Sequence, residues 1–162
     1  MKYSISLLMA FLLMSCQGNA QKEKKETKTY PVTKTEAEWK ASLSPLAYYV
    51  LREAGTERAF SSALNKNEQA GTYHCAGCGQ LLYRSENKYD SKSGWPSFDQ
   101  GVDAHLEYDV DYKLGYPRTE LRCNNCGGHL GHMFEDGPRD TTGKRHCINA
   151  AALNFIPSDG KE

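Results

Sequence analysis

The chain has 162 residues, and its 20 basic and 20 acidic side chains give a formal net charge of zero at pH 7. A balanced charge offers no bulk attraction to polyanions, so we expect no nucleic-acid partner. After a polar N-terminal stretch roughly 130 residues remain, which is enough to bury one hydrophobic core. Because no internal repeat or second linker is evident, we expect a single domain. We also expect a monomer.

The first residues are typical of an export signal. An apolar run over residues 5–14 is too short to span a bilayer, but it suits the core of a signal peptide. The run ends in residues 13–16 (LMSC), which resemble the lipobox of bacterial lipoproteins. We therefore expect residues 1–16 to be a signal peptide that ends at a lipidated Cys16.

A lipidated Cys16 would anchor the product to a membrane, so we expect a lipid-anchored, extracytoplasmic protein of the cell envelope. Cleavage by ordinary signal peptidase and an uncleaved membrane-anchored helix are the alternatives. Residues 17–29 are nearly all Lys, Glu, Thr, Gln and Asn, which predicts a flexible polar tether. The folded domain should then occupy residues 30–162.

Helix signals open the domain, and strand signals follow them. Thr35 to Glu38 have the pattern of a capping box, and Ser44 followed by Pro45 marks a second helix that Gly55 would end. The later sequence consists of short Tyr-, Val- and Thr-containing segments broken by Gly, Asn, Asp and Pro. This pattern predicts strands and turns, and so a mainly β domain with short N-terminal helices.

Four of the six cysteines form two Cys-x-x-Cys pairs, Cys75 with Cys78 and Cys123 with Cys126, each followed by glycine. Each pair can hold a metal ion from one tight turn, and together they supply the four thiolates of a tetrahedral zinc site. Such a site leaves no position for substrate, so we expect one structural zinc that joins two distant hairpins. Disulfides are the alternative, because the expected compartment is oxidising.

Cys147 has no partner in such a pair and is the candidate nucleophile. If its segment is extended, Arg145, Cys147 and Asn149 share one face of the strand while His146 points to the other. A positive charge beside a thiol favours the reactive thiolate, so we expect Arg145 to lower the pKa of Cys147. The alternative is a small buried hydrophobe, which is how free cysteines usually behave.

Two further motifs supply candidates for the same site. His129 and His132 directly follow the second cysteine pair, and two imidazoles there would act as proton donors beside a thiol. Between the cysteine pairs, residues 93–98 (SGWPSF) form a bend at glycine and proline. This bend either presents Trp95 and Phe98 as an apolar wall or buries them in the core.

Together these residues resemble the methionine sulfoxide reductase B family, from about Thr35 to Pro157. Besides the two cysteine pairs, the matching motifs are residues 55–58 (GTER), 94–98 (GWPSF), 128–132 (GHLGH), 136–138 (DGP) and 145–153 (RHCINAAAL). The resemblance implies a mainly antiparallel β fold with two sheets, short N-terminal helices and a structural zinc.

The resemblance also implies a reaction that fits the candidate site. The thiolate of Cys147 would attack the sulfoxide sulfur of methionine R-sulfoxide, free or in proteins, and would release methionine while becoming a sulfenic acid. By the same resemblance, His132 protonates the leaving oxygen. His129 and Asn149 then help to hold the oxygen and its water network.

Three further residues have roles implied by the resemblance. Arg145 favours the thiolate, Trp95 receives the methyl group of the substrate, and Phe134 completes the apolar wall. An enzyme of this kind in the cell envelope would repair oxidised envelope proteins.

The chain departs from the family's pattern at three positions. Ser93 stands where many members have a recycling cysteine, His146 replaces the usual tyrosine, and Ala150 replaces the usual serine. With Cys16 lipidated or removed and four cysteines committed to zinc, no intramolecular partner for Cys147 is evident. We therefore expect an external thiol or a thioredoxin-like reductant to recycle the sulfenic acid.

Two other classes of function remain compatible with these residues. One is a noncatalytic, zinc-stapled redox sensor whose Cys147 is simply oxidised. The other is a cysteine hydrolase that uses Cys147 and His132. Turnover of methionine sulfoxide separates all three hypotheses.

Overall fold

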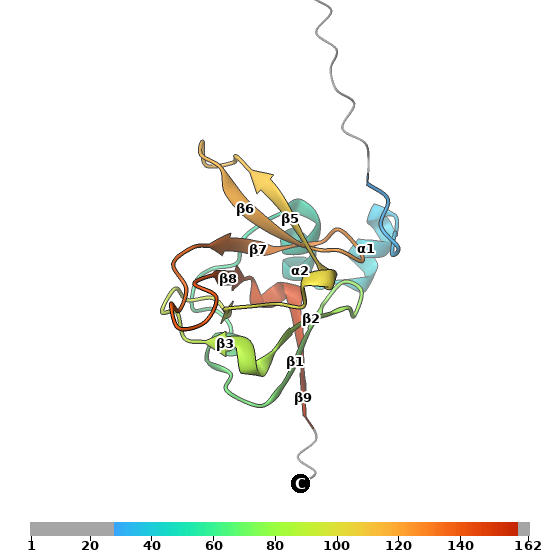
Figure 1. Cartoon of the computed structure of the whole chain (residues 1–162). Coiled ribbons are helices and arrows are strands. Elements are labelled where there is room, and N and C mark those ends of the chain that lie inside the picture. The colour runs from blue at the N-terminus through green and yellow to red at the C-terminus, as the bar shows by residue number, and fades with distance from the viewer. Residues whose placement is uncertain (1–27, 159–162) are drawn as a thin grey trace, which may run out of the picture.

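The computed structural model describes residues 28–158. The expected signal peptide, its Cys16 and residues 17–27 of the expected tether lie outside this range. Within it, two short α-helices precede nine strands that form two antiparallel sheets (Figure 1), which confirms the predicted mainly β fold. Among the described residues, no helix is long and apolar enough to cross a membrane.

The two helices begin where the sequence predicts. Helix α1 (Glu36–Ser42) has the predicted capping box, in which the Thr35 hydroxyl accepts from the backbone N–H of Glu38 and the Glu38 carboxylate accepts from the backbone N–H of Thr35. Helix α2 (Pro45–Glu53) has Ser44 as its cap and a proline in its first turn. Local hydrogen bonding therefore fixes both starts.

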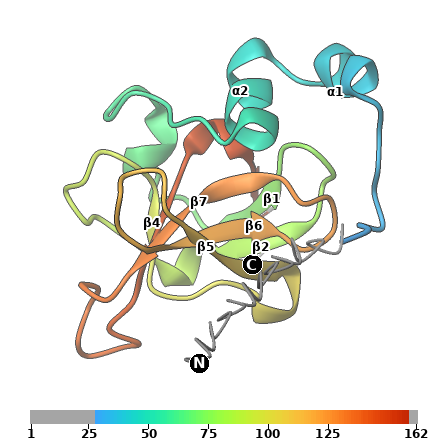
Figure 2. The same ribbon diagram turned by 90° about the horizontal axis from the view of Figure 1, so that it is seen from above.

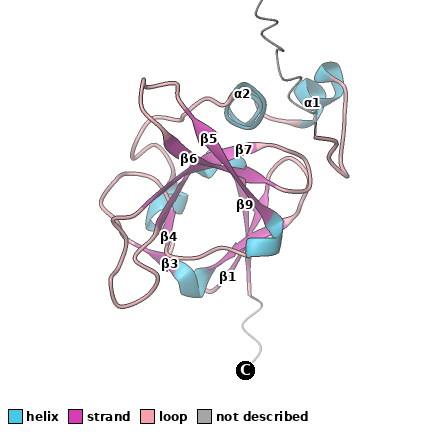
Figure 3. Ribbon diagram, turned by 45° about the horizontal axis from the view of Figure 1, so that its top comes forward, coloured by secondary structure: helices cyan, strands magenta, loops and turns pink. Residues whose placement is uncertain are grey.

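Helix α2 ends one residue earlier than expected. Ala54, and not Gly55, takes the left-handed conformation that closes the helix, with φ of 51°. A Cβ on Gly55 would lie 2.2 Å from the ring of Tyr49, so a larger residue there would require this exposed ring to move. Figures 2 and 3 show both helices on one side of the strands, where α2 packs against β7.

The smaller sheet has the order β2-β1-β9 and the larger has the order β3-β4-β8-β7-β6-β5. The smaller sheet consists of β1 (Gly71–Cys75), β2 (Leu81–Arg84) and β9 (Leu153–Pro157). The larger consists of β3 (Lys88–Tyr89), β4 (Ser97–Phe98), β5 (Leu106–Asp111), β6 (Arg118–Cys123), β7 (His129–Phe134) and β8 (Arg145–Ile148). Short 3₁₀ helices lie at η1 (Ala63–Lys66), η2 (Ser85–Asn87), η3 (Asp103–His105) and η4 (Ala150–Ala152).

Aromatic side chains from both sheets form the centre of the core. The ring of Phe98 stacks on Tyr83 with centroids 4.3 Å apart and meets the edge of Tyr73 at 5.0 Å. Phe98 is therefore a core residue, and of the two aromatics in the Gly-Pro bend only Trp95 is left for a pocket wall. His146 also faces this core from β8, and burial lowers its pKa to about 4, so the ring is neutral at pH 7.

Candidate functional site

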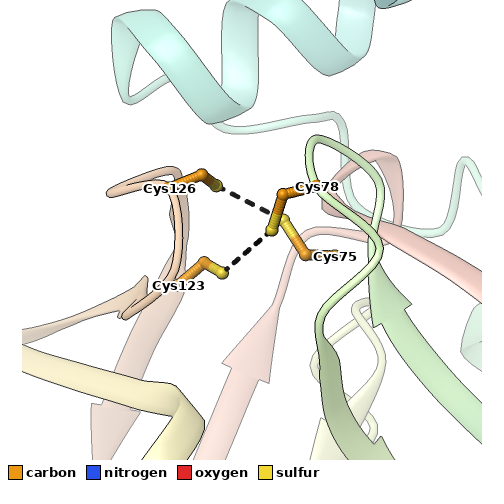
Figure 4. A group of neighbouring side chains, drawn as sticks. All are labelled: Cys75, Cys78, Cys123 and Cys126. Carbon is orange, nitrogen blue, oxygen red and sulfur yellow. Dashed lines mark hydrogen bonds between the residues drawn. The ribbon is translucent and has the colours of Figure 1, made fainter. Parts of the chain in front are cut away.

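The four paired cysteines form a cluster that joins the two sheets (Figure 4). Cys75 ends β1, and Cys78 lies in the turn that follows it. Cys123 ends β6, and Cys126 lies in the turn between β6 and β7. Their Sγ atoms all lie within 4.8 Å of one another, and two separations across the cluster are 3.7 Å and 3.6 Å.

This donor set fits zinc and does not fit disulfides. Zinc–sulfur bonds of about 2.3 Å in a tetrahedron place the sulfurs roughly 3.8 Å apart, close to the separations in the cluster. A disulfide would need a separation of about 2.05 Å, and all four thiols are free. The cluster can therefore hold one metal ion between two strand ends that are far apart in the sequence.

The two turns of the cluster are built alike. The N–H of Gly79 donates to the carbonyl of Cys75, and the N–H of Gly127 donates to the carbonyl of Cys123, both at 2.8 Å. Both glycines have positive φ, 76° and 69°, which glycine adopts without steric cost. The glycine after each pair turns the backbone toward the sulfurs, as the sequence predicts.

Cys147 lies on β8 between two neighbouring strands. Its directly opposite residues are Ser97 on β4 and His132 on β7. Opposite residues of antiparallel strands project to the same face, so His132 and Cys147 lie side by side on one face of the larger sheet. Arg145, two residues before Cys147, projects to this face as well, which agrees with the predicted alternation.

A bulge in β7 brings His129 to the face that carries His132. Residues three apart in a regular strand project to opposite faces. The register between β6 and β7 shifts by one residue beside His129, which leaves Leu130 as the extra residue. The two imidazole rings consequently lie 5.3 Å apart.

His132 is held by a carboxylate from β5. Its Nε2 lies 2.8 Å from Oδ2 of Asp111, and Arg118 forms an ion pair with the same carboxylate. The backbone N–H of Lys113, followed by His132 and Arg118, holds the pKa of Asp111 well below its usual range. Asp111 therefore accepts, and the proton of neutral His132 is on Nε2. Burial still lowers the pKa of His132, although Asp111 opposes this effect.

His129 has a corresponding partner on β6. Its Nδ1 lies 2.6 Å from Oε1 of Glu120. Burial alone would raise the pKa of Glu120, but His129 and then Arg122 outweigh burial, so the pKa is lowered. Each of the two histidines is thus oriented by a carboxylate from another strand of the same sheet, Glu120 from the adjacent β6 and Asp111 from β5 beyond it.

Arg145 is fixed beside the thiol by a bidentate ion pair. Its Nε and Nη2 donate to the two carboxylate oxygens of Asp136 at 2.8 Å and 2.9 Å. The guanidinium carbon lies 4.4 Å from the ring centroid of Phe134, which is a cation–π distance. The ion pair raises the pKa of Arg145, so its charge is permanent.

The charge of Arg145 does not by itself produce a low pKa at Cys147. Burial raises the pKa of this thiol, and the hydrogen bond with Ser93 and the charge of Arg145 lower it by less. Arg145 acts in the expected direction, but the net pKa lies above its ordinary value and not below it. Cys147 therefore rests as a thiol at neutral pH.

Three serine hydroxyls extend from Cys147 toward β4, and we call Ser93, Ser91 and Ser97 the hydroxyl chain. Ser93 Oγ lies 3.8 Å from the Sγ of Cys147 and 2.8 Å from Ser91 Oγ. Ser91 Oγ lies 2.6 Å from Ser97 Oγ, which donates to the backbone oxygen of Trp95 at 3.2 Å. Cys147 thus ends a continuous hydrogen-bonded series.

A pocket of about 150 Å³ opens at Cys147. Five of the predicted site residues line it, namely Cys147, His132, Asn149, Trp95 and Phe134. The volume suits one extended side chain and not a larger ligand. His129 and Arg145 lie beside this pocket and not on its wall, so they act on it through their neighbours.

Glu57 positions two of the pocket residues. Its backbone oxygen accepts from Trp95 Nε1 at 3.1 Å, and its backbone N–H donates to Oδ1 of Asn149 at 3.0 Å. Its buried carboxylate accepts from the first two backbone N–H groups of η4, at 2.6 Å and 2.9 Å. Asn149 Nδ2 donates one hydrogen to the carbonyl of Leu130, and its second N–H has no partner among the described residues.

A larger groove of about 850 Å³ continues from the pocket and shares Thr56, Arg118 and His132 with it. The groove runs between the end of α2 and the β5–β6 hairpin, which projects from the rest of the fold in Figure 1. Tyr49 and Tyr112 line it and are exposed. If a peptide side chain entered the pocket, the residues next to it in the peptide would therefore lie along this groove.

Sequence reasoning misses several residues that shape the site. The alternation of acidic residues at 107–112 predicts only a solvated strand face, whereas Asp111 holds His132. Thr56 and Glu57 belong to a matching motif, but nothing in it predicts that Glu57 reaches the segment after Cys147. The signal for Asp111 exists in the period of two, but only the register of β5, β6 and β7 shows which residues it meets.

This geometry defines a class of protein, the thiol-dependent enzymes. Within residues 28–158, Cys147 is the one cysteine outside the metal-type cluster. It lies at a pocket of side-chain size with a candidate proton donor beside it.

Comparison with known proteins narrows the class. Residues 43–157 match the SelR domain. The chain is 50% identical over 132 residues to a peptide methionine sulfoxide reductase MsrB from Burkholderia thailandensis, covering 81% of this chain and 92% of the relative. It is 53% identical over 127 residues to the protein of the same name from Leptospira interrogans, covering 78% and 96%. The chain therefore belongs to the MsrB family of peptide methionine sulfoxide reductases, as its motifs predict.

A third relative of the same name, from Bradyrhizobium diazoefficiens, is 50% identical over 135 residues, covering 83% of this chain and 96% of the relative. Among solved structures, the Mis18 'Yippee-like' domain aligns with a TM-score of 0.46 and 14% identity, over 57% of this chain and 100% of that one. This last likeness is too weak to bear on function.

Proposed function

We propose that the chain reduces methionine R-sulfoxide to methionine, with Cys147 as the nucleophile. The observation that carries this proposal is the pocket at Cys147, where the thiol lies beside His132 and an apolar wall in a chain of the MsrB family. Sulfoxide reduction requires a sulfur nucleophile and a proton for the departing oxygen, and the pocket offers both.

In the first half of the reaction the sulfur of Cys147 attacks the sulfoxide sulfur. The sulfoxide oxygen takes a proton from His132 as the bond between the two sulfurs forms. The hydroxyl then moves from the substrate sulfur to the Cys147 sulfur, while the sulfur–oxygen bond of the substrate and the transient sulfur–sulfur bond both break, which leaves Cys147 as a sulfenic acid. Methionine leaves as a thioether. The substrate is thus reduced by two electrons and Cys147 is oxidised by two.

The other pocket residues hold the substrate in place. Trp95 and Phe134 contact the methyl and methylene groups, because these two rings form the apolar part of the wall. The unused N–H of Asn149 donates to the sulfoxide oxygen. His129 supports this arrangement through His132, whose ring it faces.

An external thiol restores the enzyme in the second half of the reaction. One thiol attacks the sulfenic acid, so that the hydroxyl leaves as water and a mixed disulfide with Cys147 forms. A second thiol then attacks the mixed disulfide, which regenerates the Cys147 thiol and leaves the reductant as a disulfide. Supporting this, Ser93 lies 3.8 Å from the Cys147 sulfur and cannot form a disulfide. A thioredoxin-like dithiol fits the role, because it supplies both thiols.

The cysteine cluster would hold one zinc ion, which supplies folding free energy and takes no part in the redox steps. Its four thiols complete a tetrahedron and leave no site for substrate. Zinc would keep these thiols unavailable for disulfide exchange with Cys147.

We further propose that a lipid on Cys16 holds the enzyme at the cell envelope, where it repairs oxidised proteins. The LMSC sequence that closes the N-terminal apolar run supports this placement. Cys16→Ser should move the protein from the membrane fraction to the soluble fraction. Equal membrane retention of Cys16→Ser would contradict lipid anchoring.

The activity is tested with separated R and S epimers of a protected methionine sulfoxide. The chain from residue 29 onward is supplied with dithiothreitol and compared with Cys147→Ser. We expect methionine from the R epimer only, and a loss of at least about a thousandfold in Cys147→Ser, because the nucleophile is removed. Methionine is quantified by chromatography.

A folded, zinc-loaded sample that reduces neither epimer would overturn the proposal and favour the redox-sensor hypothesis. After one turnover without thiol, we expect a single sulfenic acid on Cys147, trapped with dimedone and located by mass spectrometry. An intramolecular disulfide at Cys147 would contradict the external recycling step.

A further inference from the structure

The direction of the hydrogen bonds in the hydroxyl chain follows from its far end, at Ser97. Ser97 Oγ donates to the backbone oxygen of Trp95, and a carbonyl oxygen can only accept. Ser97 has a single proton, so it must accept from Ser91. By the same count Ser91 accepts from Ser93, and Ser93 accepts from the Cys147 thiol.

Loss of the thiol proton reverses this requirement. A thiolate sulfur has no hydrogen and can only accept. Ser93 must then donate to Sγ, Ser91 to Ser93, and Ser97 to Ser91. We propose that the hydroxyl chain reverses its direction in this way when Cys147 ionises, and that the reversed chain stabilises the thiolate.

The thiol proton does not leave through the hydroxyl chain. The backbone oxygen of Trp95 at the far end accepts a hydrogen bond but does not take up a proton at neutral pH. The proton therefore goes from Sγ to His132, which lies opposite Cys147, or to solvent. Each serine keeps its own proton throughout, so all three hydroxyls stay neutral.

The reversal requires only rotation of the hydroxyl hydrogens. Ser91 keeps its hydrogen-bond partners with Cys147 as a thiol and as a thiolate. In both states the backbone N–H of Ser93 also donates to its Oγ, at 3.4 Å. The hydrogen bond to Trp95, at 3.2 Å, is lost, and a charge-assisted hydrogen bond to sulfur is gained. Aligned hydroxyls polarise one another, so the outer serines strengthen the donor next to the sulfur.

The other titratable groups around Cys147 come from three elements. Arg145 on β8 is charged and paired with Asp136, which follows β7. His132 faces the sulfur from β7, and Tyr89 on β3 interacts with it electrostatically. On the side of β4, the described groups that can donate hydrogen bonds toward Cys147 are the serines of the hydroxyl chain. Burial raises the pKa of Cys147, and hydrogen bonds from these donors oppose this effect by stabilising the thiolate.

The first test measures the rate at which iodoacetamide alkylates Cys147 as a function of pH. The full chain is used, and the peptide that contains Cys147 is resolved by mass spectrometry, so other cysteines do not contribute. Ser93→Ala should raise the pKa of Cys147 by about one unit, which makes alkylation roughly tenfold slower below the midpoint. Ser93→Thr retains a hydroxyl and should restore the midpoint.

Ser85→Ala is the matched control, because it removes a serine hydroxyl that accepts from the backbone N–H of Gly71 in another part of the fold. It should leave the alkylation midpoint of Cys147 unchanged. An unchanged midpoint in Ser93→Ala would overturn the proposal, as would a midpoint in Ser93→Thr as high as in Ser93→Ala.

A double-mutant cycle tests whether Ser91 acts through Ser93. Ser91→Ala alone should raise the midpoint by roughly a third of the Ser93→Ala shift, because it removes the cooperative part. Added to Ser93→Ala, it should have no further effect. An unchanged or lowered midpoint in Ser91→Ala would show that Ser93 acts alone. An equal shift from Ser91→Ala with and without Ser93→Ala would show a general effect on the fold. Either result would overturn the proposal that the hydroxyl chain acts as a unit.

The catalytic consequence rests on the proposed function, whereas the alkylation test does not. In a single turnover of a peptide R-sulfoxide at neutral pH, Ser93→Ala should release methionine about tenfold more slowly. Above the raised midpoint both proteins carry the thiolate, so the ratio of their rates should return toward one, which a structural defect would not allow. If the protein had no reductase activity, the methionine-release measurement would fail, but the alkylation midpoints of Cys147 could still be measured.

Discussion

The pKa values of His132 and Cys147 are displaced in opposite directions. Burial lowers the pKa of His132 below its ordinary value and raises the pKa of Cys147 above its ordinary value. The form that reacts, imidazolium beside thiolate, is therefore a minor species at every pH. Its fraction is largest between the two pKa values. Below both values the thiolate is lost as the pH falls, and above both the imidazolium is lost as the pH rises.

We expect a bell-shaped pH dependence of kcat/KM for a peptide R-sulfoxide, and Asp111→Asn should shift it. Without the carboxylate charge that favours imidazolium, the pKa of His132 falls further, so the acid limb moves to lower pH and the maximum drops about tenfold. Asp109→Asn, two residues earlier on β5, is the control. An unmoved acid limb in Asp111→Asn would remove Asp111 from this role.

At the scale of elements, the segment after β8 depends on a residue far away in the sequence. The Glu57 carboxylate accepts from the first two backbone N–H groups of η4, across a separation of 93 residues for the first contact. It thereby caps η4 and fixes Asn149 at the pocket. Gly131 on β7 contributes in another way, because a Cβ there would lie 2.0 Å from the carbonyl oxygen of Cys147.

Glu57→Gln should therefore weaken both the fold and the site. A glutamine side chain offers one acceptor oxygen for two backbone donors, so one buried N–H loses its partner at a cost of about 1–3 kcal/mol. Urea unfolding measures this loss, and kcat should fall with it because Asn149 is displaced. Glu53→Gln, which changes an exposed carboxylate, should alter neither quantity.

Elements with local signals were predictable, and those set by pairing between distant strands were not. Thr35 marks the start of α1 and the glycines after the cysteine pairs mark the tight turns, because each effect acts within a few residues. Strand alternation also places His146 in the core. The bulge that unites His129 with His132 depends on the register with β6, which no local pattern specifies.

The same contrast applies to charge at the site. The proximity of Arg145 to Cys147 follows from a period of two, but burial of the thiol follows only from the packed fold. Sequence reasoning therefore finds the sign of the arginine's effect and misses the larger opposing one.

At the scale of the whole molecule, the cysteine cluster connects the two sheets through the ends of β1 and β6. If zinc occupies it, removal of the metal should unfold the domain rather than merely inactivate it. We expect chelation, or Cys78→Ser, to lower the unfolding temperature by more than roughly 10 °C in circular dichroism. An unchanged unfolding temperature in a sample shown to be metal-free would contradict a structural metal.

The groove beside the pocket predicts a difference between peptide and free substrates. Tyr112→Ser removes an exposed ring along the groove, so kcat/KM for a peptide R-sulfoxide should fall about fivefold, whereas free methionine R-sulfoxide should be unaffected. Tyr116→Ser is the control, since Tyr116 lies just before β6, is 55% exposed and does not line the groove. Equal losses on both substrates would contradict a role in binding flanking residues.

The pairing of β1 with β9 limits when the domain can be completed during synthesis. Strand β1 lies between β2 and β9, and Cys75 pairs with Leu153 near the end of the chain. The smaller sheet therefore stays incomplete on the ribosome until residues 153–157 have emerged. Both cysteine pairs emerge before them, so a captured metal ion would align the turns of the two sheets while the nascent chain still lacks its last strand.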